Sequence, residues 1–512
     1  MILSFNPQSL GKFTPLTRIL WLTLFFLVPF VMDARGQAIS ARISVESLDP
    51  ARVRIEGVRG DNVRSWSFRN TYASVGNLGE RIENLKLMNA DGAGVEVRKL
   101  AAGEYEAKEP CARFSYDVKL APPSNVADAA YVSWLAEKRG VLMLNDLLPR
   151  VPDERKANSS DVIISFVLPV SWQIVSLENR KARDAFVVKD AARAVFFVGQ
   201  NLRERQQRVG TMNFTLATNG EWAFTDEDAM RAVLDVLREH TGTNGGVPRE
   251  SAMLLLSPFP RSVGASRWSA ETRGGTTLLL LGQAPSRTAA LTHLSVPLAH
   301  ELFHLWIPNG VALDGNYDWF YEGFTQYQAL RTCVRLGTLT FQDFLNAIGG
   351  AFDAYRLIAD RDKFSLIEAS QRRWTSAPGL IYNKGLLAAF LYDLTLRHKT
   401  GGKRSLDNVY QELFRRYHQQ EARVDGNAAL IKALGEANEM QSFVQQYIEH
   451  AGAIDLPSAI SSFGLRIDPG GVRTRLMLID SLNHKQRDLL RKLGYNNDSR
   501  VTSQRVELRK AK

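Results

Sequence analysis

Two histidines and a glutamate stand together at the spacing of a metal-binding helix, in the segment His300-Glu301-Leu302-Phe303-His304. Residues four apart lie on one face of an α-helix, so both imidazoles can reach one ion. Neutral imidazoles are good zinc ligands, and zinc brings the pKa of a water that it binds to about 7. Glu301 is displaced by one residue, so we expect it to hold the activated water and to take its proton.

A third ligand candidate follows in Asp318-Trp319-Phe320-Tyr321-Glu322-Gly323. The interval after His304 leaves room for a loop and a return helix that brings Glu322 back to the ion. Two histidines and one glutamate leave a fourth zinc position open for water, which is the catalytic arrangement. The alternative is a chance motif with two surface histidines and a solvated helix carboxylate. The third candidate ligand in this aromatic and glycine-containing setting favours a zinc site.

Several helices must position these side chains. Pro297 suits the first turn of a helix and Ser295 can cap it, so we expect the helix of the two histidines to begin there. Apolar residues recur at helical spacing over residues 383–398 and 406–417, and Gly401-Gly402 separates the two patterns. The sequence therefore predicts a mostly helical C-terminal part.

The first part of the chain has a β-like residue pattern, and a helical pattern begins near Asp226. Short segments rich in Val, Ile and Phe, separated by Gly, Pro and Asn, predict an antiparallel sandwich there. We therefore expect an α+β multidomain protein, because strands, a mixed middle part and helices follow one another. The expected units are a signal peptide (1–38), an N-terminal β-sandwich-like domain (39–216), a catalytic domain (217–398), a C-terminal helical region (399–467) and an unassigned basic tail (468–512).

The N-terminus is typical of a secretory signal. Lys12 and Arg18 precede an apolar run over residues 19–32, which is shorter than the roughly 20 residues that a membrane-spanning helix needs. Small residues follow, so cleavage after Gly36 or Ala38 fits. We expect an exported protein, periplasmic or extracellular, with no integral membrane span after cleavage. An uncleaved N-terminal anchor is the alternative.

Composition supports a globular protein, because 45% of the 512 residues are hydrophobic and 23% are charged. The net charge of +10 is scattered, and basic runs interleaved with aromatic residues are missing, so nucleic-acid binding is not favoured. The basic cluster at residues 485–512 is interpreted as a solvated chain end. The two cysteines, Cys111 and Cys333, stand in different expected domains. Two buried free thiols are the favoured interpretation, and a disulfide between them stays open.

These motifs resemble those of the gluzincin zinc aminopeptidases. The run HELFHLWIPNG (300–310) matches the M1 pattern HExxHxWxGN at Trp306 and Asn309, with Pro308 in place of a glycine. The wording EGFTQY after Tyr321, and Tyr382-Asn383-Lys384-Gly385 with the helix after it, is more similar to the M61 glycyl aminopeptidases. So is the segment 443–465. The resemblance spans roughly residues 226–467.

The resemblance implies a thermolysin-like catalytic domain with one Zn²⁺ per chain on His300, His304 and Glu322. It also implies that Tyr382 helps to stabilise the oxyanion of the tetrahedral intermediate. Glu271 stands where a glutamate of a GxMEN motif binds the free amine of the substrate in M1 enzymes. This chain has Ser-Ala-Glu-Thr there, and it also lacks the GGLEH wording of M61.

The expected function is zinc-dependent hydrolysis of peptide bonds, as an exported aminopeptidase that releases small N-terminal residues from a peptide or protein substrate. A zinc endopeptidase on the same core is the enzymatic alternative. A catalytically silent protein that keeps the fold for binding is a second alternative, and a zinc-dependent lipid or epoxide hydrolase is a third. The joint presence of Glu301, the three ligands and Tyr382 favours an enzyme.

Overall fold

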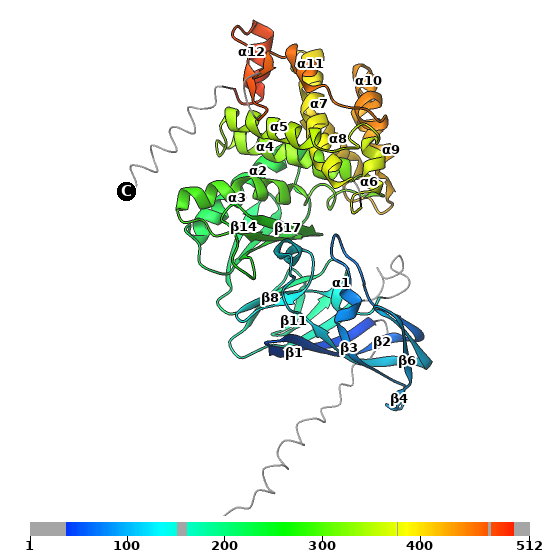
Figure 1. Ribbon diagram of the computed structural model, residues 1–512. Helices are drawn as coiled ribbons and strands as arrows, with labels where there is room; N and C mark the ends of the chain where they lie inside the picture. The colour runs from blue at the N-terminus through cyan, green and yellow to red at the C-terminus, as the bar shows by residue number, and fades with distance from the viewer. Residues whose placement is uncertain (1–36, 151–160, 376, 469–472, 496–512) are drawn as a thin grey trace, which may run out of the picture.

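The computed structural model describes residues 37–150, 161–375, 377–468 and 473–495, and it divides into a sheet-rich half and a helical half (Figure 1). The prediction of an α+β multidomain protein with a sheet-rich N-terminal part and a helical C-terminal part is confirmed. The expected signal peptide lies outside the described residues except for Gln37 and Ala38, which begin the first strand. Residues 496–512 of the expected tail also lie outside them.

A nine-stranded sheet forms the outer layer of the N-terminal half. Strands β1 and β2 pair antiparallel, and Ile43 faces Ile55 with both side chains fully buried. Alternation of buried and exposed residues along β2 gives the sheet one core face and one solvent face. Its strands are β1 (Gln37–Leu48), β2 (Ala51–Ser67), β3 (Ile82–Met88), β4 (Gly94–Val95), β5 (Val97–Ala101), β6 (Glu104–Lys119), β9 (Asp161–Val167), β11 (Asn179–Ala182) and β12 (Ala185–Val188).

A four-stranded sheet lies beneath it and is buried on both faces. Its order is β10 (Gln173–Val175), β13 (Val195–Gly199), β8 (Arg139–Met143) and β7 (Trp134–Leu135). Phe196 packs into the core shared with the nine-stranded sheet, whereas Phe197 packs into a core shared with a five-stranded sheet on the other side. A strand covered on both faces needs apolar residues at every position, which explains the continuous apolar run in β13.

A five-stranded sheet follows, in the order β14 (Arg203–Val209), β15 (Met212–Thr218), β16 (Ser251–Pro258), β18 (Thr276–Leu281) and β17 (Trp268–Arg273). The central three strands run parallel, and β17 is an antiparallel edge strand. The expected domain border at residue 217 falls inside β15, because an apolar alternation predicts a strand without saying which sheet it joins.

Helices cover this sheet and build the rest of the chain (Figure 1). Helix α2 begins at Asp226 behind a Thr225 capping box, at the residue where the sequence changes texture. The helices are α1 (Leu144–Leu147), α2 (Asp226–Asn244), α3 (Arg287–Phe303), α4 (Thr325–Arg335), α5 (Phe341–Arg356), α6 (Leu366–Gln371), α7 (Gly385–Lys399), α8 (Leu406–Tyr417), α9 (Gly426–Gly435), α10 (Gln441–Val444), α11 (Leu456–Ser461) and α12 (His484–Lys492).

Short elements complete the described part of the chain. Three π-helical segments are η5 (Trp319–Phe324), η6 (Leu380–Lys384) and η8 (Gln445–Glu449). The 3₁₀ segments are η2 (Leu78–Arg81), η3 (Val126–Ala130) and η7 (Asn438–Met440), and two small sheets pair β19 (Leu313–Asp314) with β20 (Val424–Asp425) and β21 (Leu465–Ile467) with β22 (Leu476–Leu478). The pair β19–β20 joins the loop after the histidine helix to the helical region.

The helix of the two histidines begins earlier than its proline suggests. Ser286 caps α3 through the backbone N–H of Ala289, so the prediction of a start at Ser295 and Pro297 is wrong. Pro297 lies inside the helix, and the Ser295 hydroxyl donates to the carbonyl of Thr292. A proline costs a helix one hydrogen bond, and burial of the neighbouring leucines in the core offsets that loss.

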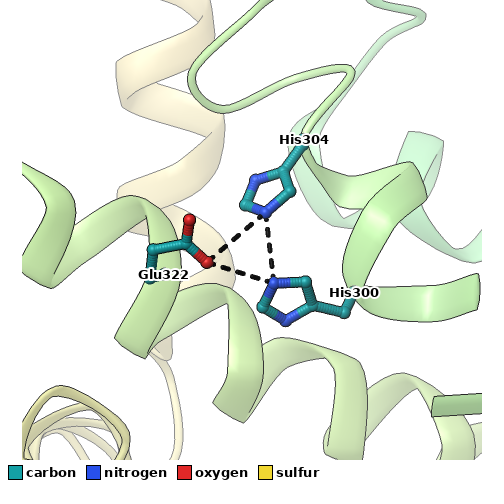
Figure 2. A group of neighbouring side chains, drawn as sticks. All are labelled: His300, His304 and Glu322. Atoms are coloured by element: carbon teal, nitrogen blue, oxygen red, sulfur yellow. Dashed lines mark hydrogen bonds and ion pairs between the residues drawn. The ribbon is translucent and has the colours of Figure 1, made fainter. Parts of the chain in front are cut away.

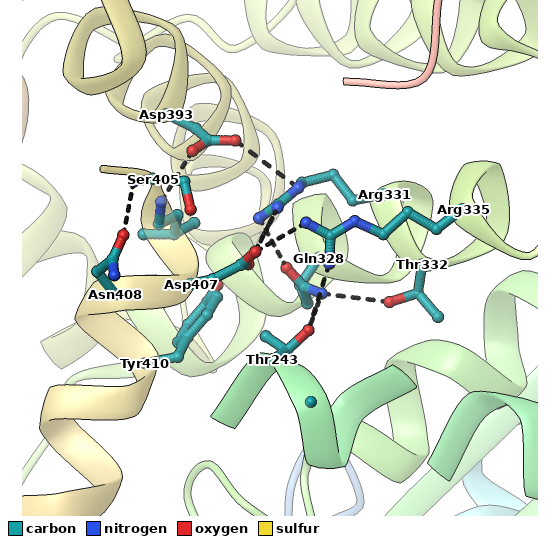
Figure 3. A network of polar contacts seen from close by, with 12 residues as sticks. Thr243, Gln328, Arg331, Thr332, Arg335, Asp393, Ser405, Asp407, Asn408 and Tyr410 are labelled. Carbon is teal, nitrogen blue, oxygen red and sulfur yellow. Dashed lines mark hydrogen bonds and ion pairs between the residues drawn. The ribbon is translucent and has the colours of Figure 1, made fainter. Parts of the chain in front are cut away.

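A buried ionic network connects α4, α7 and α8 (Figure 3). Arg331 on α4 lies 3.0 Å from Asp407 on α8 and 3.7 Å from Asp393 on α7. Asp393 also accepts the backbone N–H of Leu406 at 2.8 Å, which caps the start of α8. Each buried charge has an opposite charge and a hydrogen-bond partner, so the network fixes α4 against α7 and α8.

Cys111 in β6 and Cys333 in α4 are both buried and free, in agreement with the favoured interpretation. Burial raises the pKa of the Cys333 thiol to about 11, so it is a poor nucleophile and a poor ligand near neutral pH. Across the residues that the structure describes, no helix combines the length and the hydropathy that crossing a membrane requires.

Candidate active site

Helix α3 carries His300, Glu301 and His304 at its C-terminal end and is fixed at both ends. At its start, Arg287 forms two hydrogen bonds of 2.6 and 2.8 Å with Asp228 of α2. The Arg287 guanidinium lowers the pKa of that carboxyl to about 2, so the pair is ionised at neutral pH. Near its end, His240 of α2 contacts the Ala299 carbonyl at 2.8 Å. The histidine pair therefore stands on a rigid support.

The structure brings the three predicted ligands together (Figure 2). His300 Nε2 lies 3.1 Å from His304 Nε2 and 3.3 Å from Glu322 Oε2. His304 Nε2 lies 3.7 Å from the same carboxylate oxygen. All three side chains are buried, and one ligand atom from each falls within 4.8 Å of the others.

The donor set fits zinc. The Nδ1 of His304 faces the carbonyl of Ile307 at 2.9 Å, and a carbonyl only accepts, so Nδ1 carries the proton and Nε2 keeps its lone pair for a metal. Three lone pairs then converge on one point from two nitrogens and one oxygen. Zinc takes such sets at about 2.0–2.2 Å and keeps a fourth position for water or substrate.

Neighbouring charges set the pKa values of Glu322 and His304. Burial opposes charge on both Glu322 and His304, but their neighbours reverse its effect on the pKa. The guanidinium of Arg373 and the two imidazoles hold the pKa of Glu322 well below its usual range. The Glu322 carboxylate raises the pKa of His304 to about 9 despite burial. A proton therefore competes with zinc for this site at neutral pH.

Glu301 is placed beside the ligands and outside the cluster. Its side chain is buried, and the Thr272 hydroxyl donates to Oε2 at 3.0 Å. Burial raises the pKa of Glu301, which makes its carboxylate a stronger base than an exposed one. Thr272 follows Glu271 on β17, so the edge strand itself orients the candidate base.

Glu322 lies in the π-helical turn η5, and Tyr382 lies in the π-helical turn η6. The two turns touch through glycine: a Cβ on Gly323 would come within 2.5 Å of the Gly385 Cα. Only two residues without side chains allow this approach. The contact brings Tyr382 close to Glu322, and burial together with the Glu322 charge raises the pKa of the Tyr382 phenol. The phenol therefore stays protonated and can donate.

Glu271 faces the same cleft from strand β17. Its Oε1 accepts a 2.5 Å hydrogen bond from the Tyr72 hydroxyl, and Arg273 Nε lies 3.8 Å away. Tyr72 belongs to the N-terminal half, so two domains meet at this carboxylate. The cleft that they enclose has a volume of about 990 Å³ and also contains Glu301 and Tyr382.

Trp306 and Asn309 connect the ligand helix to its surroundings. The Trp306 indole donates to the Gly246 carbonyl at 2.8 Å. The Asn309 amide donates to the carbonyls of His304 and Thr272, and its oxygen accepts the N–H of Gly274. These two residues therefore hold the segment at the end of α3 against the loop that follows α2 and against the edge strand.

Four residues of the site were not predicted from the sequence, namely Tyr72, Tyr131, Thr272 and Arg373. All four line the cleft. Tyr72 and Tyr131 come from the N-terminal half, and no local pattern marks them. Thr272 adjoins Glu271, and Arg373 lies in the segment before Tyr382, so their proximity to predicted residues was the one available signal.

Comparison with known proteins adds to this geometry. Residues 311–387, which include Glu322 and Tyr382, match the family described as M61 glycyl aminopeptidase. Among curated proteins, none matches the sequence. Over residues 311–387 the chain is therefore similar to that family.

Solved structures share the fold of this chain. An aminopeptidase N family protein from Idiomarina loihiensis is 16% identical with a TM-score of 0.71, over 85% of this chain and 81% of that one. A two-domain M1 zinc metallopeptidase variant bound to L-tryptophan is 15% identical with a TM-score of 0.50, over 83% and 96%. An M1 zinc metallopeptidase from Deinococcus radiodurans is 16% identical with a TM-score of 0.49, over 81% and 94%. At 16% identity, the likeness to the Idiomarina loihiensis protein shows the fold alone.

Removal of a ligand should abolish zinc binding. We expect the His300→Ala and Glu322→Gln chains to retain almost no zinc after dialysis, because two ligands do not complete the site. Metal content per chain, measured by elemental analysis, checks this. His450→Ala, at an exposed histidine, is the control and should keep one zinc per chain. Equal zinc content in these three variants and the unaltered chain would contradict the ligand assignment.

Zinc affinity of the unaltered chain should fall about tenfold per pH unit below pH 9, because one proton on His304 must then be displaced by the metal.

Replacement of Gly323 by alanine should separate the two π-helical turns. The new methyl group meets the Gly385 backbone, so we expect a loss of about 1–3 kcal/mol in unfolding free energy and weaker zinc binding. Denaturant unfolding and zinc titration measure both effects. Gly350→Ala in α5 is the control, because a Cβ there meets nothing within 4 Å and should stabilise the helix by about 0.5–1 kcal/mol. Similar behaviour of the two variants would contradict the close-contact argument.

Proposed function

We propose that this protein is an exported zinc aminopeptidase that releases small residues from the N-terminus of peptides. One observation supports this above all others: a buried His300, His304 and Glu322 cluster opens into a cleft that also contains Glu301, Tyr382 and Glu271. The donor set suits one zinc ion per chain. The surrounding residues supply a base, a phenol donor and a carboxylate for the substrate amine.

The residues of the chain then have distinct tasks in peptide hydrolysis. Zinc, when bound, polarises the scissile carbonyl and makes water more acidic. Glu301 holds the attacking water, takes its proton and passes that proton to the leaving amine. Tyr382 donates its phenol proton in a hydrogen bond to the carbonyl oxygen as negative charge develops there. Thr272 keeps the Glu301 carboxylate in place through the 3.0 Å hydrogen bond.

Glu271 supports the assignment as an aminopeptidase. Its carboxylate lines the cleft at the edge strand, and its one strong hydrogen bond comes from Tyr72. A carboxylate at this place can pair with the free ammonium group of a substrate and thereby limit cleavage to the first residue. The preference for small residues is suggested by the match to the glycyl aminopeptidase family. An endopeptidase on the same core is the second candidate, since the Arg273 charge 3.8 Å away offsets part of the Glu271 charge.

We propose export because of the sequence of residues 1–38. A positive start, a short apolar run and small residues fit a cleaved secretory signal. N-terminal sequencing of the mature chain, expected to begin at Gln37 or Ile39, distinguishes cleavage from an anchored form that begins at Met1. Neither nucleic acid nor an integral membrane span is part of the proposed function.

Loss of the base or of the phenol should lower turnover while zinc stays bound. We expect Glu301→Gln to reduce kcat by about 10²–10⁴-fold, because the amide cannot accept the proton of water. Tyr382→Phe should reduce kcat by about 10²–10³-fold through loss of one donor to the developing charge. Hydrolysis of glycyl and alanyl chromogenic substrates, with zinc content measured in parallel, checks both. Full activity of Glu301→Gln would contradict the enzymatic assignment.

Substrate choice tests the role of Glu271. The unaltered chain should cleave peptides with a free amine and leave N-blocked ones intact, and a zinc chelator should stop cleavage. Glu271→Gln keeps the size of the side chain and removes its charge, so we expect kcat/KM for free-amine substrates to fall by about 10- to 100-fold, the loss of one charge-assisted contact. Glu239→Gln, on α2 and paired with Arg335 away from the cleft, is the matched control. Cleavage of blocked peptides alone would favour the endopeptidase.

A further inference from the structure

Arg373 is a nearly buried charge at the centre of the site, with a side chain only 11% exposed. It comes from the segment just after α6, which is held against η5 by a 2.8 Å hydrogen bond from the Trp319 backbone N–H to the Ser370 hydroxyl. The guanidinium also lies 4.4 Å from the centre of the Trp374 ring. The hydrogen bond to Ser370 holds the neighbouring backbone of Arg373, and the Trp374 ring packs against its guanidinium.

The guanidinium donates to four oxygens of the site. Nη1 donates to Asp318 Oδ1 at 2.7 Å and to the Tyr321 hydroxyl at 2.8 Å. Nη2 donates to Glu322 Oε1 at 2.7 Å and to the Tyr382 hydroxyl at 3.0 Å. One side chain thus connects a ligand carboxylate with the phenol expected to donate to substrate.

The two carboxylate oxygens of Glu322 have different partners. Arg373 holds Oε1, whereas Oε2 faces the imidazoles of His300 and His304. A carboxylate with one oxygen engaged by a charged hydrogen bond offers the other oxygen alone to a metal. Arg373 therefore leaves Oε2 as the oxygen that would reach a metal held by the two histidines.

The contact with Tyr382 decides where the phenol proton goes. Arginine has donors and no acceptor, so the Tyr382 oxygen must accept from Arg373. Among the described residues, the structure gives this hydroxyl no acceptor for its own proton. Tyr321 provides the contrast, because it also accepts from Arg373 but donates to Asp318 at 2.6 Å. The proton of Tyr321 is occupied, and the proton of Tyr382 is available.

We infer that Arg373 is a positioning residue that assigns one oxygen of Glu322 to the metal and keeps the Tyr382 proton available for the carbonyl oxygen of the substrate. The second half of this inference rests on the proposed function, whereas the first half concerns metal binding alone. A lysine could supply the charge, but its single nitrogen lacks the planar fork that reaches Glu322 and Tyr382 together.

Substitution of Arg373 separates these roles. Arg373→Met removes charge and donors at similar length, Arg373→Lys keeps the charge, and Arg372→Met is the matched control. Arg372 is exposed and stacks on Phe364 at 4.8 Å, away from the ligands. Each variant is measured for zinc dissociation constant by chelator competition, for melting temperature of the metal-free chain, and for kcat and KM on a glycyl substrate.

We expect zinc to bind Arg373→Met about 10- to 100-fold more weakly, as for other partners of metal ligands. Its kcat at saturating zinc should fall about 100-fold with KM changed less than about threefold, since the lost interaction acts on the transition state. Arg373→Lys should restore zinc affinity to within about threefold of the unaltered chain and leave kcat low. Arg372→Met should match the unaltered chain.

Equal zinc affinity and equal kcat in Arg373→Met and Arg372→Met would overturn the inference. If Arg373→Met does not fold, Arg373→Lys decides, and a kcat like that of the unaltered chain would overturn the role toward Tyr382. If the unaltered chain hydrolyses no peptide, the proposed function fails by itself. The zinc affinities of the variants then still decide the role of Arg373 toward Glu322.

Discussion

The site depends on a backbone contact between two π-helical turns. Gly323 and Gly385 meet so closely that a methyl group on either would strike the other backbone. The residue before Gly323 is the candidate ligand Glu322, and Tyr382 lies one turn before Gly385, so the contact sets the distance between metal ligand and phenol. The extra residue of a π-helical turn also shifts the side chains relative to a regular helix, a feature common at functional sites. Helix α4 continues from η5 and helix α7 continues from η6, so the same contact also places these two helices beside each other.

Charge balance is the second condition for the site. Glu322, Glu301 and Asp318 are buried close together, and carboxylates without counter-charges would be costly there. Arg373 supplies one positive charge, and a zinc ion on His300, His304 and Glu322 would supply the rest. The charges of the buried carboxylates would then be balanced by the groups that hold them in place.

The mixed architecture and several helices could be predicted because they depend on local patterns. The texture change near Asp226 marks the true start of α2, and the apolar spacing over residues 406–417 coincides with α8. The start of α3 could not be placed, because Pro297 resembles a first-turn proline although buried packing carries the helix through it. The sequence also could not show that the expected domain border at residue 217 lies inside β15. The apolar pattern of β15 predicts a strand but does not indicate which sheet the strand joins.

The sequence by itself determined the chemistry that a short helix can encode. His300 and His304 must share a face and Glu301 must flank it, because helix periodicity fixes these relations within one turn. Only the tertiary structure decided which distant side chains complete the site. Tyr72 reaches Glu271 from another domain, and Arg373 reaches Glu322 from a separate segment. Such contacts come from chain folding over long separations, for which no local spacing exists.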